Sequence, residues 1–353
     1  MINDTVSIDG FRTPRATCLL APNPSPMTLD GTNTWVIAEP GSPSVVVVDP
    51  GPQDEGHLRR VLAAAVAGDR RIARILLTHG HLDHSAGAAR LAELSGAPVQ
   101  AADPARRLGA EGLADGDVIT AAGCELRVVA TPGHTADSVS LLLPADGALF
   151  TGDTVLGRGT TVIAEDGNLG DYLRSLDQMR ALAEAADLRL LLPGHGPMLP
   201  DPIGILDYYL THRAERLDQV RSALAVGAKT PAEIVAMIYT DVDRSLWPAA
   251  QWSVRAQLDY LAEAEAAGAF AYKSAQQGAA TTLVAAVAPE FAHTGGHYLD
   301  DGREAHTVPN DADLFANSHG VKQWAIDAGT AQKLWTVSLA LIEGGASGRD
   351  RSR

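Results

Sequence analysis

Apolar runs and Ala/Leu-rich stretches alternate over the first two hundred residues. Short runs rich in β-branched or aliphatic residues, each followed by Gly, Pro or Asp, predict strands at 45–48, 72–77, 125–130, 139–143 and 188–192. Ala and Leu at helical spacing predict helices over 54–68 and 84–95. Because strands alternate with helices, the pattern predicts a layered α/β domain.

The pattern of the chain changes after about residue 203. Stretches rich in Arg, Glu, Ala and Leu predict helices over 205–226 and 250–267. Between them, Thr230-Pro231-Ala232-Glu233 has the residues of a helix start, with Thr as N-cap, Pro at the first helical position and Glu three residues on. We therefore predict an α/β domain over residues 1–203 and a small helical domain over 204–272.

The composition is that of a soluble globular protein, with 46% hydrophobic and 20% charged residues. The net charge of −15 argues against a protein that coats nucleic acid. The chain has no apolar run long enough to span a membrane, and Asp4 and Asp9 stand where a secretory signal would be apolar. Cys18 and Cys124 lie far apart without CxxC spacing, which favours free thiols over a disulfide. These features predict a cytoplasmic protein without a membrane partner.

The candidate chemistry lies in the loop that follows the predicted strand at 72–77. Three imidazoles and one carboxylate are packed there, at His79, His81, Asp83 and His84. A loop after a buried strand can direct alternate side chains into one cavity, and this donor set suits Zn²⁺. A polar surface loop is the alternative, but four ligand-type residues so close together favour a metal site.

Three other segments place a ligand-type residue next to glycine at the end of a strand. They are Thr131-Pro132-Gly133-His134-Thr135, Thr151-Gly152-Asp153-Thr154 and Pro193-Gly194-His195-Gly196. Glycine lets the backbone come close to a metal without a Cβ clash. Each segment is a weak signal alone. Together they predict side chains that meet the first cluster at one edge of a sheet.

This order of motifs resembles the metallo-β-lactamase superfamily over residues 15–200. The resemblance implies a four-layer αββα sandwich with a dimetal site at one edge of the paired sheets. It implies two Zn²⁺ ions, with manganese or iron as alternatives. The implied ligands are His79, His81 and His134 for one ion, Asp83, His84 and His195 for the second, and Asp153 between the two.

The same resemblance implies hydrolysis by a metal-bound hydroxide. Asp83 would be the catalytic residue that orients this hydroxide and passes a proton to the leaving group. No GxSxG motif and no pair of Glu residues competes for this role in the sequence.

Three stretches are similar to one branch of that superfamily, that of the β-lactamase-like protein 2 type. They are residues 22–35, residues 152–162 and the helical segment 204–272, which resembles the winged-helix-like domain of the branch. The resemblance implies a substrate that is either a phosphodiester in single-stranded RNA or a small ester or thioester. It does not determine the oligomeric state, and a homo-oligomer is compatible with it.

Two alternatives remain open. The first is a thioesterase of the glyoxalase II type, for an acylated glutathione, but Leu156-Gly157-Arg158-Gly159 stands where that family has a Gly/Cys-rich stretch. Arg213, Arg216 and Arg221 only loosely share a helical face, so we expect a solvated surface; facing the cleft, they would meet phosphates. The second alternative is a winged-helix binding protein with a vestigial hydrolase domain, which the complete ligand set argues against.

Residues 273–353 resemble the tail of a short-chain dehydrogenase, on Gln277–Thr282, Gly295–Asp301 and Leu334-Trp335. The cofactor loop and the Tyr-x-x-x-Lys pair of that family are absent from the sequence. We therefore expect a fused, partly disordered remnant without dehydrogenase chemistry, with a closing helix at 327–342. The histidines of this tail are spaced irregularly and are expected at the surface, not at a metal: His293, His297, His306 and His319.

Overall fold

The structure is a computed structural model that describes residues 7–240 and 242–266, together with four short strands nearer the C-terminus. The chain divides into two compact units, residues 1–266 and 267–353. In the second unit, β12 (Leu299–Asp300) pairs antiparallel with β13 (Arg303–Glu304), and β14 (His306–Val308) pairs parallel with β15 (Gly320–Lys322). The rest of the segment that resembles a dehydrogenase tail lies outside the described residues. So do the predicted helix at 327–342 and His293, His297 and His319.

The first unit contains two sheets. The first has the order β1-β2-β3-β4-β5, with β1 to β3 antiparallel and β3 to β5 parallel. Its strands are β1 (Ala16–Leu20), β2 (Asn33–Ile37), β3 (Ser44–Val48), β4 (Arg71–Leu76) and β5 (Val99–Gln100). The four valines of β3 are fully buried, because β-branched side chains on a central strand pack on both faces of the sheet.

The second sheet has the order β11-β10-β9-β8-β7-β6 and is antiparallel except for the β9–β10 pair. Its strands are β6 (Val118–Ala121), β7 (Cys124–Ala130), β8 (Val139–Leu143), β9 (Ala148–Gly152), β10 (Leu190–Pro193) and β11 (Leu199–Pro200). Every residue of β8 and β9 is buried, so these central strands are covered on both faces.

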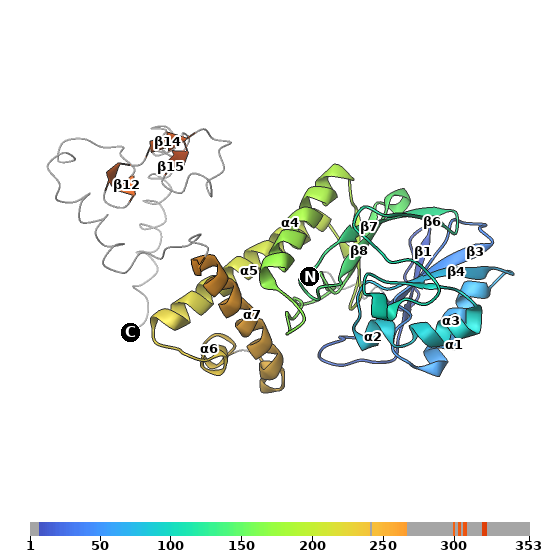
Figure 1. Ribbon diagram of the computed structural model, residues 1–353, viewed down its shortest axis with the longest axis horizontal. Coiled ribbons are helices and arrows are strands. Elements are labelled where there is room, and N and C mark those ends of the chain that lie inside the picture. Colours follow the sequence, from blue (N-terminus) through green and yellow to red (C-terminus); the bar gives the residue numbers. More distant parts are fainter. Residues whose placement is uncertain are drawn as a thin grey trace, which may run out of the picture. The chain divides into compact units, whose positions relative to one another are not determined.

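Helices cover the outer face of each sheet, and the inner faces pack on one another. On the first sheet, alternate valines of β3 face α1 (Glu55–Val66) and α3 (Ala88–Ser95), while the others face the second sheet. Helix α4 (Leu169–Ala185) packs on the far side of the second sheet (Figure 1). Between the sheets the rings of Trp35 and Phe150 lie 5.4 Å apart, edge to face. The predicted four-layer αββα sandwich is confirmed.

Three helices follow the sandwich: α5 (Pro202–Ala225), α6 (Pro231–Ile238) and α7 (Trp247–Ala266). Helix α6 begins with the predicted capping box, in which Thr230 and Glu233 each accept from the other's backbone amide. Helices α5 and α7 share a hydrophobic core with α4, through residues such as Tyr209 and Val254. The helical segment is therefore fixed against the sandwich. The boundaries at 203 and 272 stay predictions.

The connections include the short helices α2 (Leu82–Ser85), η1 (Pro104–Arg106), η2 (Pro144–Asp146) and η3 (Arg244–Leu246). Across the part of the chain that the structure describes, no helix has the length and apolar character to cross a bilayer.

Candidate metal centre

Loops at the ends of four strands carry the predicted ligands. The segment after β4 turns into α2 and carries His79, His81, Asp83 and His84. His134 follows β7, Asp153 follows β9 and His195 follows β10. All of these loops reach the same edge of the paired sheets, as predicted, because each leaves the end of a strand that points to that edge.

Glycine is required at two positions in these loops. Gly133, at φ +133°, lies so close to Tyr172 of α4 that a Cβ would stand 2.3 Å from its backbone nitrogen. A Cβ on Gly194 would stand 2.6 Å from both Asp153 Oδ1 and His84 Cε1. Real Cβ atoms do not approach other atoms so closely, so any larger residue would push the ligand-type side chains apart.

The seven predicted ligands converge into three overlapping groups, in each of which the potential ligand atoms lie within 4.8 Å of one another. These groups are His79, His81 and His134; His79, His84 and Asp153; and Asp83, His84 and His195. The first and third correspond to the two ion sites that the family resemblance implies. Their function as ligands stays a prediction.

Distances within the cluster support one shared centre. His81 Nδ1 lies 3.1 Å from His79 Nε2 and 3.0 Å from His134 Nε2. His195 Nε2 lies 3.2 Å from His84 Nε2 and 3.1 Å from Asp83 Oδ2. The carboxylate of Asp153 stands between the two halves. It lies 3.3 Å from both His84 Nε2 and His195 Nε2, and 3.7 Å from His134 Nε2.

Each imidazole has an oxygen acceptor behind it. The outer ring nitrogens contact Thr78 Oγ1 (3.0 Å from His79), Asp166 Oδ2 (3.1 Å from His81), Asp49 Oδ2 (2.9 Å from His84), Val162 O (2.9 Å from His134) and Gly31 O (3.0 Å from His195). A hydrogen bond donated from the outer nitrogen leaves the inner nitrogen with a free lone pair. Lone pairs that face one another at about 3 Å, beside two carboxylates, fit a site for divalent cations with N and O ligands.

Comparison with known proteins agrees with this geometry. A family profile described as "Metallo-beta-lactamase superfamily" matches residues 27–195, and one described as "Beta-lactamase associated winged helix domain" matches residues 230–266. A Drosophila melanogaster relative, "Beta-lactamase-like protein 2 homolog", is 34% identical over 69% of this chain and 86% of its own length. The chain belongs to the metallo-beta-lactamase superfamily.

Further relatives agree with this assignment. An Aspergillus fumigatus relative named "Atrochrysone carboxyl ACP thioesterase" is 33% identical over 64% of this chain and 74% of its own length. A solved beta-lactamase domain protein from Burkholderia ambifaria has the same fold, with a TM-score of 0.63 and 24% identity over 74% of this chain and 91% of that one. Members of the metallo-beta-lactamase superfamily are metal-dependent hydrolases. The predicted class of enzyme is confirmed, and the alternative of a vestigial, non-enzymatic domain is set aside.

The electrostatics of this superfamily site favour cations. Burial opposes ionisation of Asp153, but His195 and His84 hold its pKa well below the usual range. For Asp83 burial has the same effect, and the contact with His195 outweighs it, so the pKa of Asp83 is also lowered. Burial lowers the pKa of both His84 and His195, yet Asp153 raises it overall, for His195 to about 9. A bound cation would replace these protons on the imidazoles.

A buried carboxylate behind the centre was not predicted. Asp49, directly after β3, is buried and accepts hydrogen bonds from Thr78 N (2.8 Å) and Thr78 Oγ1 (2.7 Å), as well as contacting His84 Nδ1. In the sequence Asp49 reads as part of a turn, because Pro50-Gly51-Pro52 follows it. Its position at the end of a fully apolar strand is the one signal that could have pointed to it.

A cavity of about 350 Å³ opens beside the cluster, with His134 and Asp153 in its wall. Most of its lining is apolar and comes from the loop between β1 and β2, the loop after β9, helix α5, the connection after α6 and the start of α7. Its apolar residues include Met27, Leu29, Leu156, Val162, Val242 and Leu246. An apolar, half-enclosed space next to a reactive centre is typical of a substrate-binding site.

Arginines also line this cavity, so the prediction that the arginines of α5 lie on a solvated surface is wrong. Arg213 of α5, expected at a solvated surface, is only 3% exposed; Arg216 is half-buried, and both line the cavity. Arg221, further along α5, does not line it. The reason is that α5 is covered by α4 and α7, so residues spaced along it meet other helices, not water.

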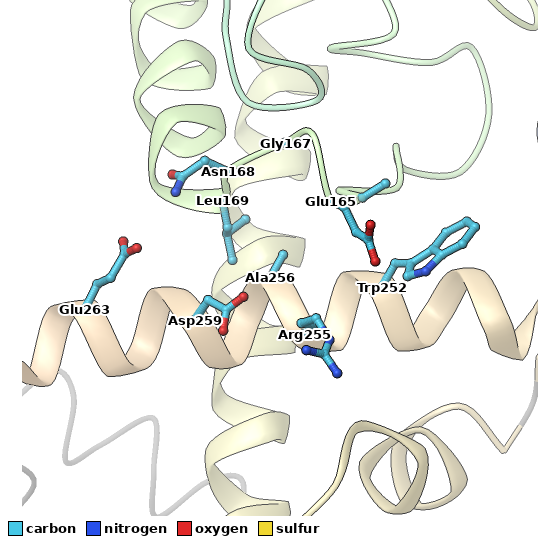
Figure 2. Close-up of a pocket in the computed structure, with 10 residues that line it drawn as sticks. Glu165, Gly167, Asn168, Leu169, Trp252, Arg255, Ala256, Asp259 and Glu263 are labelled. Carbon is cyan, nitrogen blue, oxygen red and sulfur yellow. The ribbon is translucent and has the colours of Figure 1, made fainter.

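A second hollow, of about 200 Å³, lies between α7 and the loop that leads into α4. Figure 2 shows Trp252 and Asp259 of α7 on the side of this loop, which contributes Glu165 and Asn168. It contains none of the seven predicted ligands. The chemistry therefore belongs to the larger cavity.

Proposed function

We propose that this hydrolase cleaves an ester or thioester whose acyl part is apolar. The observation that carries the proposal is the junction of two features: the cluster of seven ligand-type side chains opens onto a largely apolar cavity through His134 and Asp153. An apolar cavity of this volume fits an acyl or aryl group, since apolar surface gains free energy when it leaves water.

In this proposal the centre holds two zinc ions, with manganese or iron as alternatives. His79, His81 and His134 would hold one ion, Asp83, His84 and His195 the other, and Asp153 would contact both. The donor set and the separations of about 3 Å between ligand atoms support this assignment. Bound there, divalent ions lower the pKa of water and polarise a carbonyl.

Residues of the chain supply the remaining steps. Asp83 is partly exposed, and its lowered pKa keeps it ionised near neutral pH, so it can take a proton from water and pass it to the leaving group. Asp83 Oδ2 lies 3.1 Å from His195 Nε2, so the carboxylate stands beside the nitrogen with which it would share an ion. The apolar wall excludes other water from the acyl group, which strengthens these interactions.

The relative named as a thioesterase supports this choice of bond. A phosphodiester in single-stranded RNA is the second candidate, and the arginines that line the cavity favour it. S-lactoylglutathione, the substrate of a glyoxalase II, is a third test compound because it is a thioester with carboxylates.

The test is a substrate panel with metal analysis. The purified protein would be assayed with 4-nitrophenyl butyrate, S-butyryl-N-acetylcysteamine, S-lactoylglutathione, a β-lactam and a single-stranded RNA oligonucleotide. We expect the butyryl compounds to be hydrolysed fastest, activity to disappear after chelation, and zinc to restore it. RNA cleavage without ester hydrolysis, or full activity in metal-free protein, would overturn the proposal.

A further inference from the structure

Two arginines on α5 stand in the wall of the cavity without a carboxylate partner. Arg213 donates from Nη2 to the carbonyl oxygen of Thr161 at 2.6 Å, while its buried Nε has no hydrogen-bond partner. Arg216 donates from Nη1 to Gln219 Oε1 at 2.8 Å. Neither forms an ion pair with any acidic side chain in the described ranges, 7–240 and 242–266.

Other arginines nearby are paired. Arg158, which lines the same cavity, lies 2.6 Å from Asp30 Oδ2, and Arg221 on α5 lies 2.6 Å from Asp218 Oδ1. The chain has an excess of acidic residues, with a net charge of −15, so carboxylates are not scarce. What sets this wall apart is burial: Arg213 is the only buried arginine among the described residues, and it has no carboxylate partner.

Aromatic rings stabilise the two guanidinium groups only in part. Arg213 lies over the ring of Tyr172, 4.8 Å from its centroid, and Arg216 over the ring of Tyr239 at 4.6 Å. Such contacts offset only part of the cost of removing a guanidinium group from water. A bound anion with hydrogen-bond acceptors would offset the remaining cost.

The two arginines are one helical turn apart, at i and i+3, so their side chains lie on neighbouring parts of α5. His212 lines the cavity beside them, and burial together with the charges of Arg213 and Arg216 lowers its pKa to about 4. His212 is therefore neutral near pH 7, and the positive charge of this part of the wall comes from the two arginines.

We propose that Arg213 and Arg216 form an anion subsite, which binds a carboxylate or phosphate group on the substrate. The apolar part of the substrate would fill the cavity between this subsite and the wall that carries His134 and Asp153. The inference rests on the proposed function, since it deepens the description of the ester or thioester that enters. It predicts a substrate with an anionic end, an apolar body and a hydrolysable carbonyl.

A different role for Arg213 must be separated from this one. Its hydrogen bond to Thr161 O reaches a residue whose Oγ1 lies 3.1 Å from His134 Nδ1. Arg213 could thus act only as a positioning residue for His134. Loss of such a role would slow neutral and anionic substrates equally, whereas loss of an anion subsite would affect only anionic ones.

The kinetic test uses matched substrate pairs. 4-Nitrophenyl butyrate is compared with mono-4-nitrophenyl glutarate, which adds a carboxylate, and S-butyryl-N-acetylcysteamine with butyryl-coenzyme A, which adds phosphates. In Arg213→Gln and Arg216→Gln we expect the preference in kcat/KM for the anionic member of at least one pair to fall at least about tenfold, through KM. The affected pair identifies the anion as carboxylate or phosphate.

Two controls accompany these variants. Arg221→Gln removes the same charge from the same helix outside the cavity, and it should leave both preferences unchanged. Arg216→Gln covers the case in which Arg213→Gln does not fold, because Arg216 is only half-buried. Unchanged preferences in both pairs, or an equal loss for neutral and anionic substrates, would overturn the anion subsite.

A binding measurement separates this inference from the proposed function. Calorimetry with the full chain would compare 4-phenylbutyrate and phenyl phosphate with the neutral 4-phenylbutanamide. We expect the Kd of at least one anion to rise about tenfold in the arginine variants, with the amide unaffected. Arginine-dependent binding without hydrolysis of any ester would overturn the proposed function and leave the subsite standing. Anion binding that does not depend on either arginine would overturn the subsite.

Discussion

The edge of the paired sheets and the cavity wall formed by α5 differ in how fully their polar groups are hydrogen-bonded. At the sheet edge each imidazole has an acceptor behind it, from Thr78, Asp166, Asp49, Val162 or Gly31. On α5, the buried Nε of Arg213 has no acceptor in the described structure, and neither Arg213 nor Arg216 has a carboxylate partner there. The protein itself fixes the geometry of the reactive centre, whereas the wall leaves part of its hydrogen bonding to a ligand. In the proposed function, chemistry and specificity are thus assigned to different elements.

The strongest test of this contrast is the removal of the carboxylate of Asp83. In Asp83→Asn the side chain keeps its shape but can no longer take up a proton from water, so we expect turnover to fall by at least about 100-fold. Steady-state kinetics with the best ester of the panel, together with metal analysis and circular dichroism, checks this. Near-normal turnover in a folded, metal-loaded variant would contradict the role assigned to Asp83.

Asp49 tests whether the acceptors behind the imidazoles matter. Asp49→Asn would weaken the contact with His84 Nδ1 and the hydrogen bonds with Thr78. We expect the affinity for zinc to fall about 10- to 100-fold, as is usual for partners of metal-binding histidines. Competition with a fluorescent chelator measures it. Asp207→Asn, which removes an exposed carboxylate that pairs with Arg180 and contacts none of these imidazoles, is the matched control.

His57 lies behind the centre and extends the same hydrogen-bonded chain. Its Nε2 is 2.9 Å from Thr34 Oγ1, which in turn donates to the carbonyl oxygen of Asp49. Burial lowers the pKa of His57 to about 4, while an unfolded histidine has a pKa of about 6.5. The unfolded chain therefore binds the proton first as the pH falls. The contribution of neutral His57 to stability is complete above about pH 6.5 and is lost between there and about pH 4.

The expected size of this effect is about 2–3 kcal/mol over that interval. Urea unfolding of the wild type and of His57→Gln at several pH values would measure it. The variant should lose less stability on acidification, because the histidines of the centre titrate in both proteins and cancel in the comparison. Parallel pH profiles would show that His57 does not titrate in this way.

Tyr209 joins the two regions. Its hydroxyl accepts from Leu156 N at 2.9 Å and lies 3.1 Å and 3.0 Å from the carbonyl oxygens of Leu156 and Gly159, so α5 holds the loop that follows Asp153. Tyr209→Phe leaves these buried groups unpaired, which should cost about 1–3 kcal/mol in the free energy of unfolding. Thr230→Ala is the control: it removes the cap of α6 and should cost about 1 kcal/mol without changing KM. If KM rises more in Tyr209→Phe than in Thr230→Ala, the Tyr209 hydroxyl positions the cavity loop for the substrate.

The sequence predicts best those residues that lie in short local motifs. The seven ligand-type residues lie in short motifs beside glycine, so local spacing alone locates them, and the αββα layers follow from the buried runs. Helix α4 is absent from the predicted elements although Leu169, Tyr172, Leu176 and Met179 have helical spacing. Its signal is local and could have been used.

Asp49 and Arg213 could not be found in this way. A single carboxylate after a strand reads as a turn, and its role depends on His84, which the fold brings from 35 residues away. Arg213 on a charged helix reads as a surface residue until α4 and α7 cover it. Both roles are set by packing between distant segments, which no local pattern records.

The closeness of Gly194 to the ligands has a consequence for mutational scanning. A side chain of any size at this position would displace both Asp153 and His84. In a saturation screen scored by survival or turnover, Gly194 would thus be as intolerant as a metal ligand, although it offers no functional atom. Intolerance alone would therefore enlarge the apparent centre by its spacer residues, and only a screen that reads metal content and substrate preference separately would tell spacers, ligands and recognition residues apart.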